Sequence, residues 1–322
     1  MISEKVVLGI DTSNYTTSVA IMDIQGNLIA NLKRPLQVKA GERGLRQSDA
    51  LFLHTVNIPL LMQEVREILG DTTPIAVGVS RKPRNIEGSY MPCFLAGVAA
   101  AESISAVAGI PLYGFSHQCG HIMAAVFSSG KESILDHDFA AFHISGGTTE
   151  LVGVKTVDSG FETKLFGGTA DVNAGQIIDR IGVLMGLRFP AGPHIEELAL
   201  ENKKKIPKRP ISVNGMKVNL SGLENMASKL YRETEDKCLV SAFVFDFIGR
   251  SIAAMSEAYE REFGKTTFVY AGGVMCNSII KKMLSERFDA VFAEPALSAD
   301  NAVGIAELTR RALIKEGKKS WI

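Results

Sequence analysis

Cysteine and net charge are the two features that this sequence has least of. Its four cysteines, Cys93, Cys119, Cys238 and Cys276, are far apart, which argues against a disulfide scaffold or a cysteine zinc ribbon and fits a reducing cytoplasm. Thirty-five basic residues balance thirty-five acidic ones, so the overall charge does not attract nucleic acid. We therefore expect no DNA partner, and any RNA contact must come from local basic patches.

Long uninterrupted apolar runs are also missing. The most apolar stretch, residues 91–115, is rich in small residues and is interrupted by Glu102 and Pro111, which predicts a buried helix and not a membrane span. The first residues, MISEKVVLGIDTS, lead into an apolar strand without the pattern of a signal peptide. We expect a cytoplasmic protein with no membrane contact.

Two similar hairpins, about half a chain apart, are the main signal for the fold. Residues 6–22 and 139–155 each read as an apolar strand, a small polar turn, two threonines and a returning strand. The chain has 322 residues, 46% of them hydrophobic, which is enough to bury two cores. The repetition predicts a duplicated α/β fold, with domains over residues 1–130 and 131–322 and a cleft between them.

The other segments follow helical or strand periodicity. Helices are predicted over residues 51–69, 93–108, 174–185, 195–200, 239–263, 278–286 and 300–316, strands over 74–80, 267–271 and 290–293, and a surface loop or hairpin over 201–221. A further helix, after residues 111–114, carries His117 and His121.

The turn of the second hairpin is suited to phosphate. Ser145, Gly146, Gly147 and Thr148 offer backbone N–H groups and hydroxyls with little side-chain bulk. In the first hairpin, Asp11 would instead hold a metal or a metal-bound water. Either turn alone is more often an ordinary hairpin turn, but their repetition favours a nucleotide.

Two later segments add candidate nucleotide contacts. Gly272 and Gly273 follow an apolar strand and Asn277 opens the next helix, an arrangement that suits an adenosine or ribose edge but also an ordinary turn. Asp179 could accept hydrogen bonds from ribose or substrate hydroxyls, and the alternative is a helix-surface ion pair with Arg180 or its neighbours.

The segment His117-Gln118-Cys119-Gly120-His121 puts two imidazoles on one helical face, where they could hold one metal ion. A metalloprotease is disfavoured, because Gln118 stands where such an enzyme needs a general-base glutamate. Residues 81–84 and 203–209 form two local basic patches, for which solvated loops are the first interpretation and RNA contact the alternative.

Taken together, these motifs resemble the threonylcarbamoyl-transferase family (TsaD, formerly Gcp or O-sialoglycoprotein endopeptidase) over nearly the whole chain. The resemblance is carried by LGIDTS (8–13), HQCGH (117–121), ISGGTTEL (144–151), the run from residue 167 to 193, AGGVMCN (271–277) and ADNA (299–302). It implies an actin/Hsp70/sugar-kinase-like (ASKHA) fold. It also implies transfer of a threonylcarbamoyl group from its adenylate to N6 of an adenosine in tRNA.

The resemblance also implies the site. One divalent metal, iron or zinc, would be held by His117, His121 and Asp300, and ATP or the adenylate, with magnesium as a further candidate ion, would be held by a second set of residues. From the resemblance, this set contains Ser145, Gly146, Gly147, Asp179, Gly192 and Asn277. The turns described above add Thr148, Gly272 and Gly273, and Asp11 and Asp179 are the candidate catalytic residues. The expected partners are tRNA, bound weakly without partner proteins, and related family subunits.

His143 is a candidate fourth metal ligand. It stands where archaeal relatives carry a metal-bound tyrosine, and strand alternation puts it on the same side as Ser145. The alternative is an edge-strand histidine bonded to a backbone carbonyl.

The sequence departs from the family pattern in its first-domain loops, where residues 41–49 and 81–89 replace family segments, and in the SGGTT and GQIIDR motifs. Two other functions therefore stay open: a diverged carbamoyl transferase or ATPase with another acceptor, and a non-catalytic nucleotide-binding partner.

Overall fold

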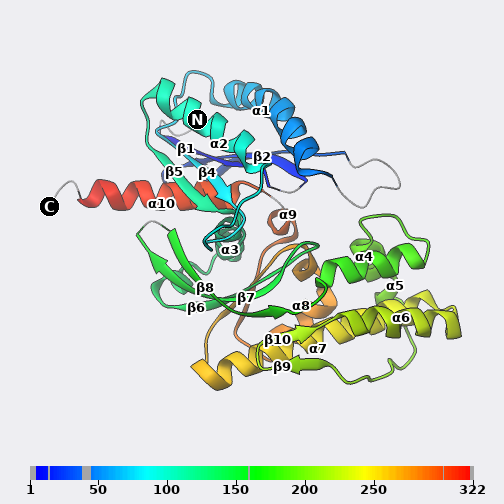
Figure 1. Cartoon of the computed structure of the whole chain (residues 1–322). Helices are drawn as coiled ribbons and strands as arrows, with labels where there is room; N and C mark the ends of the chain where they lie inside the picture. The colour runs from blue at the N-terminus through cyan, green and yellow to red at the C-terminus, as the bar shows by residue number, and fades with distance from the viewer. Residues whose placement is uncertain (1–4, 14, 38–44, 159, 300, 320–322) are drawn as a thin grey trace. The chain divides into compact units, whose positions relative to one another are not determined.

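The computed structural model describes residues 5–319, except 14, 38–44, 159 and 300. The described chain divides into two compact units (Figure 1). Unit 1 comprises residues 1–132, 156–162 and 296–322, and unit 2 comprises residues 133–155 and 163–295. Each unit is built on one mixed sheet, and each is described separately below.

The sheet of unit 1 has the order β3-β2-β1-β4-β5. β1 (Val6–Asp11), β2 (Thr16–Asp23) and β3 (Leu28–Pro35) are antiparallel neighbours, whereas β4 (Ala76–Lys82) and β5 (Leu112–Ser116) run parallel to β1. Because successive strand residues face opposite sides, β1 supplies two cores. Val6, Leu8 and Ile10 pack with α1 (Gln47–Leu69) and α2 (Phe94–Ala108), and Val7 packs with α3 (His117–Ser129) and α10 (Val303–Lys319).

Close backbone approaches hold α10 against the sheet and against α3. Gly9 and Gly78 are register partners on β1 and β4. A Cβ on Gly9 would lie 2.5 Å from the backbone nitrogen of Ala306, and one on Gly78 would lie 1.8 Å from the Thr309 hydroxyl. A Cβ on Gly304 would lie 1.9 Å from a backbone oxygen of α3. These glycines let α10 seat the helix that carries His117 and His121.

The sheet of unit 2 has the order β12-β11-β6-β7-β8-β10-β9. Its strands are β6 (Phe139–Ile144), β7 (Thr149–Val157), β8 (Gly160–Thr169), β9 (Ser212–Asn214), β10 (Lys217–Asn219), β11 (Phe268–Ala271) and β12 (Ala290–Phe292). The run β8-β7-β6-β11-β12 repeats the order β3-β2-β1-β4-β5 of unit 1, with an antiparallel hairpin beside two parallel strands. This repetition confirms the predicted duplicated α/β fold.

The helices of unit 2 pack on one aromatic-rich core. They are α4 (Ala174–Leu184), α5 (Gly192–Leu200), α6 (Ser221–Thr234), α7 (Lys237–Phe263) and α8 (Ser278–Ser285), and three short helices, η1 (Glu132–Asp136), η2 (Gly273–Cys276) and α9 (Pro295–Ser298), complete the chain. Phe142, Tyr270 and Phe292 stack on neighbouring strands. α7 is long and apolar enough to cross a membrane, but 78% of its most apolar window is buried, as in a core helix.

Most segments predicted from periodicity are present, including the hairpin β9–β10 within residues 201–221. The proposed boundary at residue 130 needs a correction at the C-terminus. The last helix, α10, was assigned to the second domain, yet it packs on β1, β2, β4 and α3 in unit 1. Its small and apolar residues match the glycine-lined face of that sheet, a complementarity that chain order does not reveal.

Candidate metal centre and nucleotide site

Helix α3 places two imidazoles one turn apart. The helix begins at His117 directly after β5, and the hydroxyl of its N-cap Ser116 accepts a hydrogen bond from the Cys119 N–H at 3.2 Å. His117 and His121 are buried, with ring centroids 4.3 Å apart. A ring nitrogen of each lies within 4.8 Å of one on the other. The spacing predicted from the sequence therefore brings the two rings together on one face of α3.

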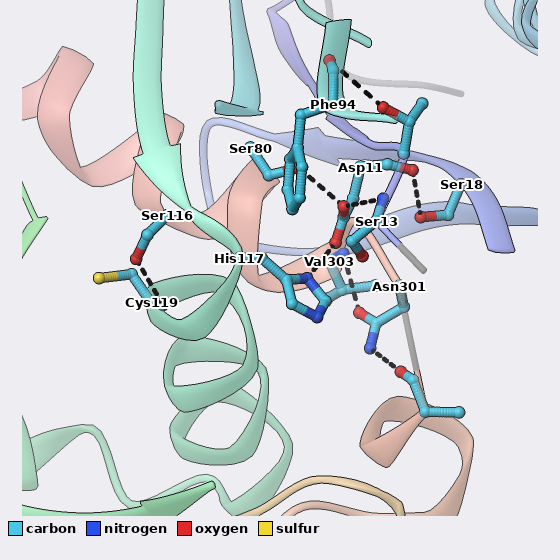
Figure 2. A network of polar contacts seen from close by, with 12 residues as sticks. Asp11, Ser13, Ser18, Ser80, Phe94, Ser116, His117, Cys119, Asn301 and Val303 are labelled. Carbon is cyan, nitrogen blue, oxygen red and sulfur yellow. Dashed lines mark hydrogen bonds and ion pairs between the residues drawn. The ribbon is translucent and has the colours of Figure 1, made fainter. Parts of the chain in front are cut away.

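The carboxylate of Asp11, at the end of β1, contacts His117 (Figure 2). Its Oδ2 lies 2.8 Å from Nδ1 of His117. Its Oδ1 accepts hydrogen bonds from the Ser13 N–H at 2.8 Å and from the Ser80 hydroxyl at 2.7 Å. Sequence reasoning missed Ser80, whose only signal was a hydroxyl near the carboxyl end of an apolar parallel strand.

The hydrogen-bond partners of Asp11 favour its ionised form, although the residue is only 1% exposed. Burial acts to raise its pKa, but the positive charge that His117 has when it is protonated, and the hydrogen bonds from His117, Ser80 and Ser13, outweigh burial and lower the pKa from 3.8 to about 2. An ionised carboxylate can only accept, so Nδ1 of His117 carries the proton. In Figure 2 the other ring nitrogen, Nε2, points away from Asp11.

This donor set fits a divalent metal. A histidine whose Nδ1–H donates to a carboxylate presents a basic Nε2, which is the usual arrangement of a metal-binding imidazole. Two imidazoles at i and i+4 suit zinc or iron. The chemistry of His117, His121 and Asp11 thus agrees with the metal that the sequence predicts.

The two other predicted ligands are His143 and Asp300. His143 lies in unit 2, on β6, where it is buried and pairs in register with Glu150 of β7 and Ala271 of β11. Because β6 has a strand on each side, the alternative of an edge-strand histidine is wrong. Asp300 lies outside the described residues. The ligand roles of both residues stay predictions.

The turn between β6 and β7 is open to a ligand. Ser145 and Thr148 close the turn through a backbone hydrogen bond of 2.8 Å, and the Ser145 hydroxyl accepts from the Gly147 N–H at 3.3 Å. Gly146 and Gly147 are exposed, and a Cβ on either would meet nothing within 4 Å. The turn therefore has the geometry in which backbone N–H groups can approach phosphate oxygens.

The N-terminus of α4 lies against this turn. The Gly175 N–H donates to the Ser145 carbonyl at 3.2 Å, and the Ala174 N–H donates to the Thr149 hydroxyl at 3.0 Å. A Cβ on Gly175 would lie 2.7 Å from the Ser145 carbonyl oxygen and from the Gly146 nitrogen, so this contact requires glycine. The positive end of the α4 dipole would favour an anion placed at this turn.

Asp179 projects from α4 and is half-buried. Its Oδ1 accepts a hydrogen bond from the Ala191 N–H at 2.8 Å. Burial raises its pKa, although the Ala191 hydrogen bond acts in the opposite direction. Arg180 forms an ion pair with Glu224 of α6 at 2.9 Å, whereas the Asp179 carboxylate accepts its hydrogen bond from the backbone N–H of Ala191. Gly192, a predicted nucleotide contact, begins α5 directly after Ala191 and has open space around it.

The strand β11 ends beside β6, so Gly272 lies against Ile144, the residue just before the turn Ser145–Thr148. Gly272 has a φ of 95°, and a Cβ there would lie 2.4 Å from the Ile144 carbonyl oxygen. Gly273 is exposed with open space around it. Asn277 caps α8 through its Oδ1, which accepts from the Ile280 N–H at 3.0 Å. Its Nδ2 is buried and has no hydrogen-bond partner among the described residues, so it can donate to a ligand.

Solved structures similar to this chain share its fold. They include the HypF protein of T. kodakarensis (TM-score 0.64, 13% identity, 97% of this chain and 48% of that one). They also include component A of the Acidaminococcus fermentans (R)-2-hydroxyglutaryl-CoA dehydratase (TM-score 0.55, 15% identity, 96% and 99%). These similar structures confirm the predicted actin/Hsp70/sugar-kinase-like fold class. At this low identity they show the fold and nothing about function.

Curated relatives match over almost the full chain. A probable bifunctional tRNA threonylcarbamoyladenosine biosynthesis protein of Methanospirillum hungatei is 30% identical over 97% of this chain, which spans 56% of that longer protein. A tRNA N6-adenosine threonylcarbamoyltransferase of Streptococcus thermophilus is 29% identical over 94% of this chain and 91% of its own length. The family model described as "TsaD: tRNA N6-adenosine threonylcarbamoyltransferase" matches residues 53–307. The chain therefore belongs to the TsaD family of tRNA N6-adenosine threonylcarbamoyltransferases.

Proposed function

We propose that this protein transfers a threonylcarbamoyl group from its adenylate to N6 of an adenosine in tRNA. The observation that carries the proposal is the contact between Asp11 and His117. It fixes a buried imidazole in the metal-binding tautomer on the same helix as His121. Family membership supports the choice of donor and acceptor.

In unit 1, His117 and His121 would hold one iron or zinc ion, with Asp300 and His143 as further ligands. A bound metal of this kind would act as a Lewis acid toward the carbamoyl carbonyl. Asp11 would serve as a positioning residue, because its carboxylate contacts protein groups through both oxygens and orients His117.

In unit 2, the turn Ser145–Thr148 would bind the phosphate of the adenylate, or the phosphates of ATP, and the N-terminus of α4 would add its dipole. Asn277, Gly192 and the Gly272–Gly273 turn would contact the nucleoside, and Asp179 would accept a hydrogen bond from a hydroxyl of the ligand. In the transfer, adenosine N6 forms a bond to the carbamoyl carbon and loses one proton. The bond from that carbon to the phosphate oxygen breaks, and AMP leaves with its phosphate held at the turn.

The proposed setting is the cytoplasm, with tRNA as acceptor and related family subunits as partners. We expect the isolated chain to bind tRNA weakly, because its net charge is zero and it has only two short basic patches. Tight binding in moderate salt by the isolated chain would contradict this expectation.

The metal site is tested by elemental analysis of the wild-type protein, His121→Ala and His143→Ala. We expect one metal ion per wild-type chain and loss of that ion in His121→Ala. Full metal in His121→Ala would refute the site, and full metal in His143→Ala would remove the fourth ligand only.

Function is tested by incubating the full chain and its partner subunits with tRNA and threonylcarbamoyl-adenylate, followed by mass analysis of the tRNA nucleosides. Modified adenosine that depends on His121 would support the proposal. Consumption of the adenylate with unmodified tRNA would assign the chain to a diverged transferase with another acceptor.

A further inference from the structure

The loop and hairpin between α5 and α6 carry the densest positive charge in the chain. Residues 202–223 contain six basic residues and no acidic one, although the whole chain has no net charge. The basic residues lie between positions 203 and 217, here called the basic segment. They are Lys203, Lys204, Lys205, Lys208, Arg209 and Lys217, and each is exposed.

The middle of the basic segment is held in a fixed place. Ile206 and Ile211 both pack on the core of unit 2. Pro207 and Pro210 lie just inside these two anchors and restrict the backbone. The carbonyl of Arg209 accepts a hydrogen bond from Arg250 at 3.0 Å. The side chains of Lys208 and Arg209 are therefore presented to solvent from an anchored backbone, which reduces the entropy lost on binding a ligand.

The charge of the segment is mostly not neutralised within the protein. Among the residues that the structure describes, Lys204 pairs with Asp236 at 2.7 Å, and the other five basic side chains have no ion pair. The other basic patch, residues 81–84, differs. There Arg81 pairs with Glu102 at 3.1 Å, and the carbonyl of Pro83 caps the start of α3 by accepting from the Gln118 N–H at 3.0 Å.

A polar hollow continues the positive surface. It has a volume of about 470 Å³ and is lined by Ala170, Ile211, Ser212, Val213, Asn214, Lys217 and Asn219. Lys217 supplies a cation and the asparagine amides supply hydrogen-bond donors, which together suit phosphate and ribose oxygens. The lining contains no acidic side chain.

We infer that the basic segment binds the sugar–phosphate backbone of the tRNA. This surface is separate in sequence from the turn Ser145–Thr148 and from α3, which carry the proposed nucleotide and metal sites. The inference rests on the proposed function for the identity of the RNA. The charges are exposed, anchored and unmatched by acids, so they can neutralise several phosphates without reading the base sequence.

The test is binding of fluorescent tRNA to the full chain by anisotropy at several salt concentrations. The variant Lys208→Gln/Arg209→Gln removes two charges from exposed positions, and Lys155→Gln/Lys282→Gln is the matched control from exposed positions elsewhere in unit 2. We expect the first variant to lower the salt slope by about 2 and to weaken binding roughly ten- to a hundredfold at 0.1 M salt. The control should keep the wild-type slope.

Transfer activity and competition are measured in parallel to separate the possible failures. Transfer to tRNA by the wild type together with an unchanged salt slope in Lys208→Gln/Arg209→Gln would overturn this inference and leave the proposed function intact. A reduced slope in that variant without any transfer by the wild type would support the RNA surface and count against the proposed function. Competition by polyglutamate as strong as by poly(U) would assign the segment to an acidic protein and overturn the inference.

Discussion

At the scale of single residues, Asp11 connects the strand β1 to His117, a proposed metal ligand on α3. It is buried, ionised and bonded through both oxygens, to Ser13 and Ser80 on one side and to His117 on the other. A buried charge is retained only where such partners stabilise it. The orientation of His117 therefore depends on the charge of the Asp11 carboxylate more than on the volume of the Asp11 side chain.

We expect Asp11→Asn to lower metal affinity by about 10- to 100-fold, as is usual for loss of such a partner. The amide would present an N–H where the carboxylate accepted a hydrogen bond from Nδ1 of His117, so His117 would lose the tautomer that leaves Nε2 available. Affinity is measured by chelator competition. Ser80→Ala, which removes one bond to Asp11 and keeps its charge, should change affinity much less. Wild-type affinity in a folded Asp11→Asn would contradict the positioning role.

A second prediction at this scale concerns the turn Ser145–Thr148, the proposed phosphate site. Gly147→Asp places a carboxylate where the account puts a phosphate, so nucleotide affinity should fall at least about tenfold by charge repulsion. The control is Gly222→Asp, an exposed position at the start of α6 where the same charge is tolerated. ATP affinity is measured by calorimetry. Equal affinity in Gly147→Asp and wild type would show that the turn does not bind the nucleotide.

At the scale of elements, Asp171 links the end of β8 to the start of α6. Its carboxylate accepts backbone hydrogen bonds from Val172 at 2.6 Å, Leu220 at 2.8 Å and Ser221 at 3.0 Å. Burial acts to raise its pKa, but hydrogen bonds from Ser221, Leu220 and Val172 outweigh burial and lower it. Asp171 thus caps a helix that begins about fifty residues further along the chain, a role that local sequence does not signal.

We expect Asp171→Asn to destabilise the protein by about 1 kcal/mol at neutral pH, because the amide lacks the charge and keeps only one of the two oxygens that accept these backbone hydrogen bonds. The folded pKa of Asp171 lies below its unfolded value of about 3.9. Its stabilisation is therefore complete above that value and is lost as the pH falls toward the folded pKa. The stability difference between variant and wild type, measured by urea unfolding, should shrink below about pH 4. A control is Asn173→Ala, because Asn173 makes no side-chain cap bond to α4. A difference that stays constant with pH would contradict the capping role.

The packing of α10 gives a prediction within one helix. Gly304→Ala would place a Cβ 1.9 Å from a backbone oxygen of α3, so we expect a loss of about 1–3 kcal/mol, the usual effect of overpacking. Gly317→Ala, in the same helix with no atom within 4 Å of the added Cβ, should stabilise by up to about 1 kcal/mol. Thermal unfolding compares the two variants. If Gly304→Ala were as stable as Gly317→Ala, the close contact between α10 and α3 would be wrong.

At the scale of the whole molecule, the periodicity and repetition of the sequence predicted most of the elements correctly, whereas the order of the elements along the chain did not predict which unit α10 belongs to. The two hairpins, the paired histidines and most helices follow local patterns, and the structure confirms them. The placement of α10 in unit 1, the bond from Ser80 to Asp11 and the cap formed by Asp171 depend on residues distant in sequence. Such contacts leave at most a weak local signal, so the sequence could not predict them.

A strain in which this chain replaces a known family member shows whether the chain modifies adenosine in tRNA by means of a metal held on α3. Mass analysis of the tRNA nucleosides from this strain should detect threonylcarbamoyl-adenosine with the wild-type chain and none with His121→Ala expressed at the same level. Absence of the modified nucleoside with a well-expressed wild-type chain, or its full presence with His121→Ala, would show that the proposed metal-dependent transfer is wrong.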